Sequence, residues 1–435
     1  MNLFNQVPAG MSRRHFVKHM AGYSAMALPA MQLTNAIAAS AGELKKHNKS
    51  AILLWMGGGP STIDIWDLKP GAPTGGQFKP IATTGEGQIS EHMPEMAKMM
   101  KHMAIVRSMS TREADHNRGR YYMHTGYVPN PNVEHPSYGS VVAHELERDK
   151  DRHLEIPPFV SVGGGSVGPG FLGMSYAPFV VGSNGDVRNL NMGMDQGRSE
   201  QRMEMLAEIE RGFVGQITGD SDPVNPRTIT AATDHAKILQ KTQNLLTSKQ
   251  MEAFKVNKED PKTLERYGKS GFAKGCLMAR RLVETGVPFV EVDLGGWDNH
   301  ANVFNTLQNT KLPELDKAMS ALVEDLVQRG MWKDTVVFWM GEFGRTPRIN
   351  GGAGRDHWAR SWSVVVGGGA FKEGVVVGKT NSDGTSVDTE PYSSQDLMAS
   401  VVKALGISLD TTFTARNGRP MKIANSGKVI KELFA

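Results

Sequence analysis

Six short apolar runs recur along the chain, and within each the apolar residues are continuous rather than alternating. They are residues 51–56, 104–107, 159–162, 287–294, 335–340 and 363–369. A continuous run suits a strand that is covered on both faces, as in a mainly parallel sheet. Helical patterns lie between the runs, and the clearest is residues 312–330, where leucine and methionine recur at intervals of three and four. The pattern predicts an α/β fold in which crossover helices connect the strands.

One long stretch, residues 190–260, departs from this alternation. It is rich in polar residues, has helical periodicity and contains no apolar run that would predict a strand. We expect it to form a helical insertion that caps the sheet.

A methionine-rich segment, residues 91–103, allows two interpretations. It holds five methionines and two histidines, and in an exported protein thioethers could bind copper. Met96, Met99, Met100 and Met103 also fall where one packing face of a helix would place them, and methionine fills cores adaptably. We interpret the segment as a packing helix and keep metal handling as the alternative.

The first residues have the features of an export signal. Residues 12–18 read SRRHFVK, and a short apolar run and the small-residue stretch AIAAS follow. A chance arginine pair in a flexible N-terminus is the alternative, but the features come in the order that a twin-arginine signal requires. We expect residues 1–38 to be a signal peptide for the twin-arginine export machinery, and residues 39–435 to be one periplasmic or secreted domain. The apolar run is too short for a stable membrane anchor.

Charge and cysteine content exclude some classes of function. Residues 1–38 contain three basic residues and no acid, so their removal takes the formal net charge from +4 to about +1. A nearly neutral domain has no electrostatic case for binding nucleic acid. Cys276 is the single cysteine, which excludes an internal disulfide and a cysteine-based zinc site. We expect it to be a small, buried side chain on a helix.

Glycine-rich turns follow several of the apolar runs, and four clusters of polar side chains fall just after such runs. Ligands gather at the carboxyl ends of strands in open α/β sheets, so these turns should line one crevice. Imidazoles and carboxylates are what zinc, manganese or iron takes where thiolates are absent, and arginines suit phosphate or sulfate. The clusters are GGWDNH with Asp298 and His300, GEFGRTPR with Glu342, Arg345 and Arg348, GRDHW with Arg355, Asp356 and His357, and ADHNRGRYYMHTG with Asp115, His116, Arg118, Arg120 and His124.

Each cluster taken alone also has a structural interpretation. Asp298 could form a turn and cap the segment after it, and His300 could be a polar residue on that segment. Arg345 and Arg348 could simply face solvent. The convergence of four clusters at strand ends favours a functional interpretation, which is metal-assisted hydrolysis of an anionic ester.

Residues 312–347 resemble a stretch of the alkaline-phosphatase-like superfamily, which includes alkaline phosphatases, sulfatases and phosphoglycerate mutases. There a long helix ending in glycine precedes a strand that starts with threonine and closes on Asp-His-Gly. Here the triplet reads Glu342-Phe343-Gly344, so the resemblance places Glu342 at a metal-ligand position and replaces the neighbouring ligand histidine by phenylalanine. GRDHW resembles the later segment that supplies a metal-binding histidine, here His357. Residues 393–407 resemble the superfamily's closing helix.

Residues 116–126, HNRGRYYMHTG, align without a gap on the sulfatase pattern in which Cys-x-Pro-x-Arg opens a helix ending in Thr-Gly. The resemblance puts His116 at the nucleophile position and Arg120 at the family's arginine. The cysteine-derived sulfatase mechanism is excluded, because Cys276 lies far from that position in the sequence.

Two features depart from the superfamily's pattern. After the first apolar run, where the superfamily carries a metal-binding aspartate, this chain has glycines, and the nearest acids are Asp64 and Asp67. Asp298 and His300 are two residues apart, where family members commonly space an aspartate and a histidine four apart.

The mature chain most closely resembles an uncharacterised exported bacterial family within this superfamily, carried as a domain of unknown function. The resemblance implies an alkaline-phosphatase-like three-layer sandwich, with helices on both faces of the sheet and a helical cap. It also implies a divalent metal. Zinc is the expected ion, with manganese, iron and calcium as alternatives.

Two functional hypotheses follow. In the first, the chain hydrolyses small phosphate or sulfate esters, with His116 as nucleophile or as general base on a metal-activated water and with arginines binding the oxyanion. In the second, it is a non-catalytic exported binding or assembly protein that retains the fold. The expected catalytic residues are His116, Arg120 and Arg345, the expected metal ligands are Asp298, His300, Glu342 and His357, and the further candidates are Asp64, Asp67 and Asp356.

Overall fold

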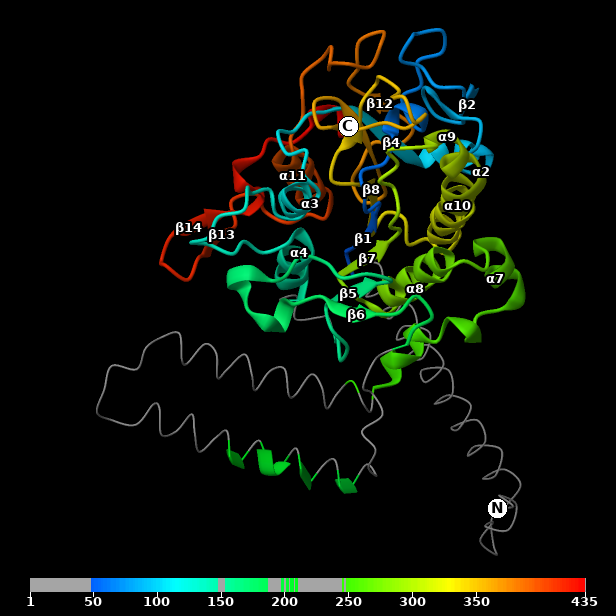
Figure 1. Cartoon of the computed structure of the whole chain (residues 1–435). Helices are drawn as coiled ribbons and strands as arrows, with labels where there is room; N and C mark the ends of the chain where they lie inside the picture. The colour runs from blue at the N-terminus through cyan, green and yellow to red at the C-terminus, as the bar shows by residue number, and fades with distance from the viewer. Residues whose placement is uncertain are drawn as a thin grey trace, which may run out of the picture. The chain divides into compact units, whose positions relative to one another are not determined.

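Figure 1 shows the chain as a computed structural model, which describes residues 48–147, 153–186 and 248–434 and some single positions between 197 and 245. The chain divides into a unit of residues 1–48 and a larger unit of residues 49–435. The expected signal peptide lies outside the described residues, as does most of the expected insertion at 190–260. The last part of that stretch is described and forms two 3-10 turns, Lys249–Phe254 and Val256–Lys258. Among the described helices, none has the length and apolar character that crossing a bilayer requires.

The larger unit is built on an eight-stranded sheet with strand order β12-β4-β11-β8-β1-β7-β5-β6. Every strand of this sheet runs in one direction except β11, which is antiparallel to its neighbours β4 and β8. The strands are β1 (Ser50–Trp55), β4 (Met103–Met109), β5 (Phe159–Val162), β6 (Phe179–Val181), β7 (Phe289–Asp293), β8 (Thr335–Met340), β11 (Trp362–Gly367) and β12 (Val376–Val377). The expected α/β class with a mainly parallel sheet is confirmed.

Three small antiparallel pairs stand outside this sheet. They are β2 (Pro80–Ala82) with β3 (Gln88–Ser90), β9 (Gly344–Arg345) with β10 (His357–Trp358), and β13 (Thr412–Thr414) with β14 (Pro420–Lys422). The pair β9–β10 contains Arg345 and His357, two of the candidate functional residues.

Helices cover both faces of the large sheet, which gives the expected three layers (Figure 1). One face is covered by α2 (Pro94–Met99), α8 (Gly271–Thr285) and α10 (Leu312–Gln328), with α7 (Pro261–Tyr267) packed on α10 and a π-helical turn, Leu307–Lys311, joining α9 (Val303–Thr306) to α10. The other face is covered by α3 (His116–Thr125), α4 (Tyr138–Glu147) and α11 (Ser394–Ala404).

The two faces hold separate hydrophobic cores because alternate residues of each strand point in opposite directions. In β1, Ile52 and Leu54 belong to the core under α8 and α10, whereas Leu53 and Trp55 belong to the core under α4 and α11. Both sets are buried, which is why the apolar runs are continuous.

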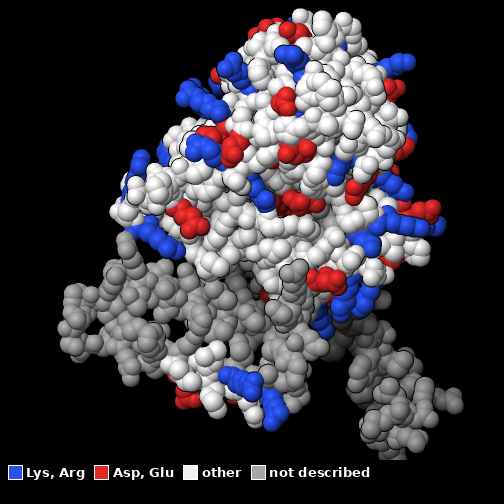
Figure 2. Space-filling model, in the orientation of Figure 1, with Lys and Arg blue, Asp and Glu red and all other residues white. Residues whose placement is uncertain are grey.

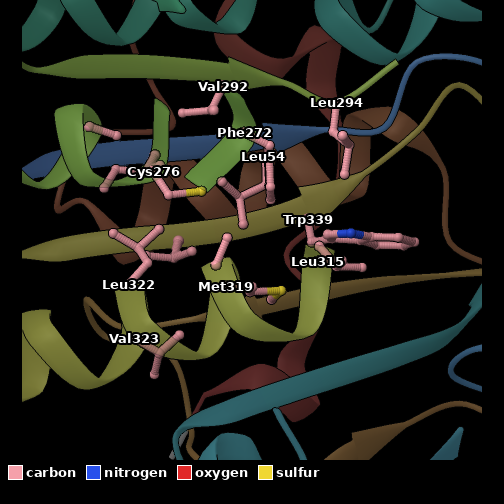
Figure 3. Close-up of a cluster of buried hydrophobic side chains, with 14 of the residues drawn as sticks. Leu54, Phe272, Cys276, Val292, Leu294, Leu315, Met319, Leu322, Val323 and Trp339 are labelled. Atoms are coloured by element: carbon pink, nitrogen blue, oxygen red, sulfur yellow. The ribbon is translucent and has the colours of Figure 1, made fainter. Parts of the chain in front are cut away.

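Figure 3 shows the first of these cores, in which Cys276 of α8 and Leu322 of α10 lie against Leu54 and Val292 of the sheet. Cys276 is fully buried and unpaired, as expected, and burial raises the pKa of its thiol well above the usual value. In the methionine-rich segment, Met96, Met100 and Met103 are buried in this core, and Met99 packs against it. The packing role of the methionines is confirmed, but the α-helix ends at Met99 and Met103 is the first residue of β4.

The strand positions that the apolar runs predict are confirmed, and three details differ. The apolar run at 363–369 corresponds to β11 (Trp362–Gly367), which is antiparallel to its neighbours. Its pattern could not show this, because a strand inside a sheet is buried on both faces whichever way it runs. The edge strands β6 and β12 have three and two residues, which is too short to leave an apolar run.

On the face of the molecule shown in Figure 2, basic and acidic side chains are interspersed. This mixture agrees with the small formal net charge.

Candidate functional site

The candidate site lies where three adjacent strands end. β8, β1 and β7 are neighbours and run parallel, so their carboxyl ends meet at one edge of the sheet. β1 leads into the glycine turn at residues 57–59, β7 leads to Asp298 and His300, and β8 leads to Glu342. The topology therefore brings together side chains that are far apart in the sequence.

The glycines after β1 let two other loops approach this edge closely. Gly58 has φ +114°, and a Cβ atom on it would lie 2.6 Å from the backbone nitrogen of Asp298. Gly59 has φ +71°, and a Cβ atom on it would lie 2.8 Å from the ring of Phe343. Only glycine tolerates these φ angles together with such contacts. These glycines thus allow Asp298 and Phe343 to pack against the turn.

His116 reaches the site from the first turn of α3. Asp115 caps this helix by accepting a 3.0 Å hydrogen bond from the backbone N–H of Arg118. His116 Nδ1 lies 2.7 Å from Glu342 Oε1, which also accepts a 2.9 Å hydrogen bond from the N–H of Gly58. The other ring nitrogen, Nε2, lies 3.3 Å from Asp298 Oδ2. The helix start therefore holds His116 between two carboxylates.

The β9–β10 hairpin supplies His357, which lies opposite Arg345 in the antiparallel pair. His357 Nδ1 lies 2.8 Å from the carbonyl oxygen of Ala114, and Nε2 lies 3.3 Å from Asp298 Oδ1. Ala114 directly precedes the cap of α3, so the helix start fixes two of the three histidines.

His300 enters from the loop after β7. Its Nδ1 lies 2.8 Å from Asp356 Oδ1. Its Nε2 lies 2.9 Å from Asp298 Oδ1 and 3.1 Å from His357 Nε2. Asp356 is exposed, and the hydrogen bond from His300 lowers the pKa of this carboxyl.

The three imidazoles share one arrangement. Each points Nδ1 at an oxygen acceptor and Nε2 toward Asp298. A proton on Nδ1 satisfies each of these acceptors, and in that neutral tautomer Nε2 presents a lone pair. Nε2 of His300 also faces Nη1 of Arg345 at 3.5 Å. Lone pairs that face one another and a carboxylate repel unless a proton or a cation lies between them. An oxygen acceptor behind a histidine whose second nitrogen faces inward is typical of histidines that ligate metals.

Asp298 lies at the centre of this cluster and contacts Arg345. The guanidinium donates to Asp298 Oδ1 at 2.5 Å, to the carbonyl oxygen of Gly59 at 2.7 Å and to that of Gly58. Partial burial favours the neutral acid, but the hydrogen bond from Arg345 outweighs it and the pKa of Asp298 falls to about 2. Arg345 itself is buried, which lowers the pKa of its guanidinium. The structure places Arg345 behind Asp298, and its expected role in oxyanion binding stays a prediction.

Phe343 and Glu342 lie on the buried side of the cluster. Phe343 is fully buried, and its ring centre lies 5.1 Å from that of His116 and 4.8 Å from that of His357. Glu342 is 3% exposed, and its Oε2 atom has no hydrogen-bond partner among the described residues. A buried carboxylate oxygen without a partner is costly unless a cation or a proton neutralises it.

The remaining candidates lie apart from these contacts. The Arg120 guanidinium donates to the carbonyl oxygen of Gly165, and its central carbon lies 6.0 Å from the centre of the Trp55 ring. No hydrogen bond joins it to Asp298 in the described structure. Its expected role in oxyanion binding also stays a prediction.

Asp64 and Asp67, the acids nearest to the glycine turn in sequence, pair with other side chains. Both carboxylate oxygens of Asp64 lie 2.8 Å from guanidinium nitrogens of Arg355. Asp67 accepts a 2.5 Å hydrogen bond from the hydroxyl of Thr380. The structure does not bring either acid into contact with the three histidines.

The donor set suits a divalent metal. His116, Asp298 and His357 each place one ligand atom within 4.8 Å of the others, and His300 adjoins two of them. Nitrogen and carboxylate donors without sulfur are what zinc, manganese or iron takes. The four side chains are 25% to 47% exposed, so small molecules can reach them.

Sequence reasoning missed two contributors to the site. The carbonyl oxygen of Ala114 orients His357, but a backbone group leaves no side-chain signal. The sequence indicates Phe343 only as the replacement of a ligand histidine, whereas its ring packs against His116 and His357. An aromatic residue among polar ones at a strand end could have suggested this.

No curated protein sequence matches this chain. Similar solved structures include the sulfatase PsFucS1 from Pseudoalteromonas sp., with 12% identity, a TM-score of 0.37 and coverage of 82% of this chain and 68% of that one. Another is the phosphonate monoester hydrolase SpPMH from Silicibacter pomeroyi, with 11% identity, a TM-score of 0.35 and coverage of 89% and 77%. A third is alkaline phosphatase from the Antarctic bacterium TAB5, with 14% identity, a TM-score of 0.32 and coverage of 82% and 98%. The model of a family described as "Protein of unknown function (DUF1501)" matches residues 48–434, and the chain belongs to this family.

Proposed function

We propose that this chain is an exported hydrolase of small phosphate or sulfate esters that works with a divalent metal ion, with zinc as the expected ion. The observation that carries the proposal is the shared orientation of His116, His300 and His357. Each places Nδ1 within 2.8 Å of an oxygen acceptor and turns Nε2 toward Asp298. The orphan oxygen of Glu342 supports the same conclusion, because it lies on the carboxylate that holds His116.

Each residue of the site has a distinct task in this proposal. His116, Asp298, His300 and His357 would hold the ion, which when bound supplies a Lewis acid that polarises the ester and acidifies water. Glu342 and Asp356 keep the proton on Nδ1 of His116 and His300. Arg345 keeps Asp298 ionised. Arg120, which is partly exposed, remains the candidate that binds the oxyanion of the substrate.

The alternative is a non-catalytic exported binding or assembly protein, and His300 is the observation that favours it. If all three histidines and Asp298 bind one zinc ion, its four tetrahedral positions are filled by protein, as in structural sites. A catalytic site instead keeps one position for water or substrate. The number of protein ligands therefore decides between the two functions.

The experiment that tests the proposal is metal analysis of the purified mature protein, with His116→Ala, His357→Ala and the control His153→Ala. His153 is exposed and lies outside the cluster, so its variant should behave as wild type. We expect stoichiometric zinc, manganese or iron in wild type and control, and loss of the ion in both site variants. A folded wild type without metal would contradict the hydrolase mechanism.

A panel of phosphate and sulfate monoesters then separates the functions. A hydrolase should turn over at least one ester, lose that activity on chelation and recover it with zinc. Metal-loaded protein that is inactive on the panel, with X-ray absorption showing four protein ligands, would favour the binding protein. If His116→Ala keeps its metal but loses turnover, His116 is the nucleophile or base rather than a ligand.

Export is tested separately. Replacing Arg13 and Arg14 by lysine should retain the protein in the cytoplasm, because the twin-arginine machinery reads the arginine pair. Cell fractionation measures this. A variant that still reaches the periplasm would contradict the proposed route.

A further inference from the structure

β7 carries a buried acid that the proposed chemistry does not use. Glu291 lies in the middle of this strand, between Leu53 of β1 and Ser161 of β5, and is 1% exposed. Its Oε1 atom lies 3.1 Å from His124 Nε2, and its Oε2 atom accepts a 2.5 Å hydrogen bond from the hydroxyl of Ser166. A carboxylate at the centre of a sheet is costly unless it is paired and hydrogen-bonded, so its partners define what it does.

His124 is equally buried, at 2% exposed, and sits in the last turn of α3. Its Nδ1 atom lies 2.9 Å from the carbonyl oxygen of Arg120, and its Nε2 atom faces Glu291. Both ring nitrogens thus face oxygen acceptors. The Nδ1 contact needs a hydrogen on the ring, and the Nε2 contact needs one on either His124 or Glu291. The ring of Trp55, whose centre lies 4.1 Å from that of His124, packs on the imidazole.

This pair joins the three segments that frame the candidate site. α3 begins at His116 and ends beside His124, β7 leads from Glu291 to Asp298, and Ser166 belongs to the loop whose Gly165 carbonyl accepts from Arg120. An α-helix is stiff, so a contact that fixes its last turn also fixes its first, about 12 Å away.

We propose that Glu291 and His124 are positioning residues, which share a buried proton and set the place of α3, and with it His116 and Arg120, relative to Asp298. The inference deepens the proposed function and rests on it for its metal-binding readout. Neither residue touches the ion or the substrate. Their effect on the site is transmitted by the helix and the strand.

The test measures zinc affinity by chelator competition in the folded mature protein. In Glu291→Gln the side chain keeps its shape but cannot hold the shared proton, and we expect about a tenfold loss of affinity, the lower end of what removing a partner behind a metal ligand costs. Ser166→Ala removes only one hydrogen bond to Glu291, so it should fold and show a smaller loss. Asp325→Asn disturbs a distant buried ion pair and serves as the stability control, with unchanged affinity.

Nuclear magnetic resonance gives a readout that does not depend on metal. In wild type, the proton in the contact between His124 Nε2 and Glu291 Oε1 should give its own signal, and Glu291→Gln should remove that signal. The Nδ1 proton of His116, which is hydrogen-bonded to Glu342, should shift in the same variant and stay unchanged in Asp325→Asn.

The outcomes separate this inference from the proposed function. If the wild type binds no metal, the proposed hydrolase fails, and the His116 resonance alone decides on the positioning role. If Glu291→Gln and Ser166→Ala leave both zinc affinity and the His116 resonance as in wild type, the pair is only structural and the inference is overturned.

Discussion

Two groups of ionisable side chains in this protein are similar in composition and differ in how their charges are matched. One is the cluster around Asp298 at the strand ends. The other is a buried network between α7, α8 and α10, centred on Arg280 and Asp325. Both contain acids and bases within hydrogen-bond distance, so proximity alone does not distinguish a functional site from a structural one.

In the network, acids and guanidinium groups face each other. Arg280 is 1% exposed, its Nε lies 2.9 Å from Asp325 Oδ2, and its Nη1 lies 2.7 Å from Glu284. Asp325 also accepts hydrogen bonds from Tyr267 at 3.0 Å and from Arg329 at 2.8 Å. Each charge has a partner of opposite sign, so the network is complete without a ligand.

In the cluster, Arg345 is the permanent cation and Asp298 already engages it. The Nη1 atom of Arg345 also lies 3.5 Å from His300 Nε2. The contact between His300 Nε2 and His357 Nε2, at 3.1 Å, has no cation between the two nitrogens. The cluster therefore lacks a cation between its imidazoles, whereas each acid of the network contacts a guanidinium group. A missing cation, rather than a high density of charged residues, indicates the metal site.

The sharpest test of this comparison removes one acid from each group in turn. The largest effect is expected at the site. Asp298→Ala removes the central oxygen, so stoichiometric metal should become undetectable. The substitution also removes the carboxylate partner of buried Arg345, so the metal-free protein should lose some unfolding free energy as well. The loss should be smaller than for Asp325→Ala, because the Asp298 side chain is half exposed and Arg345 keeps its two carbonyl acceptors. Metal analysis and urea unfolding of the metal-free protein measure both effects. Retained metal in Asp298→Ala would show that the ion binds elsewhere.

Asp325→Ala should leave the metal bound and destabilise the fold more strongly. It leaves Arg280 buried without its central partner, and breaking a buried ion pair in this way costs about 3–5 kcal/mol of unfolding free energy. Metal bound per folded molecule should stay at the wild-type level. Urea unfolding with metal analysis of the folded fraction is the measurement. A variant as stable as wild type would mean that the network does not hold the helices together.

The fold could be predicted well because apolar runs and helical periodicity show which residues are buried. In this fold, residues are buried between the sheet and the helices on each of its faces. Residues 159–162 and 335–340 are strands with the predicted bounds. The direction of β11 could not be predicted, since a buried strand has the same pattern in either direction.

The site was predicted in part. Motif spacing at strand ends indicated Asp298, His300 and His357, which the structure brings together. It could not indicate which candidates pair elsewhere, as Asp64 does with Arg355, because that depends on contacts between segments almost 300 residues apart in sequence. It also passed over Glu291, although an acid inside an otherwise apolar run is a visible signal of a buried pair.

A smaller effect is expected from Glu342→Gln, which keeps the size of the side chain that orients His116. Gln still accepts a hydrogen bond but carries no charge, so zinc affinity should fall about 10- to 100-fold. The matched control is Asp67→Asn, a buried acid that pairs with Thr380 outside the cluster. Its affinity should not change. Chelator competition measures both variants. A loss far above 100-fold would mean that Glu342 binds the ion directly through its orphan Oε2 atom.

The smallest expected effect is on the pH dependence of stability, and it compares two acids outside the site. Glu259 belongs to the network. Burial favours its neutral form, but the hydrogen bond from Arg281 outweighs this and lowers its pKa. Asp316 accepts hydrogen bonds from the N–H groups of Glu95 and Met96, and burial raises its pKa to about 6.

The two acids should change stability with opposite signs. The lowered pKa of Glu259 gives stability that is complete above the unfolded value of about 4.3 and is lost as pH falls through the folded pKa. The raised pKa of Asp316 means that the folded state binds more protons between about pH 4 and 6, so stability falls as pH rises through that window. Urea unfolding from pH 3 to 7 should show a weaker acid loss in Glu259→Gln and a flatter curve between pH 4 and 6 in Asp316→Asn. Parallel curves for both variants would contradict the distinction between an acid matched by a cation and an acid matched only by backbone N–H groups.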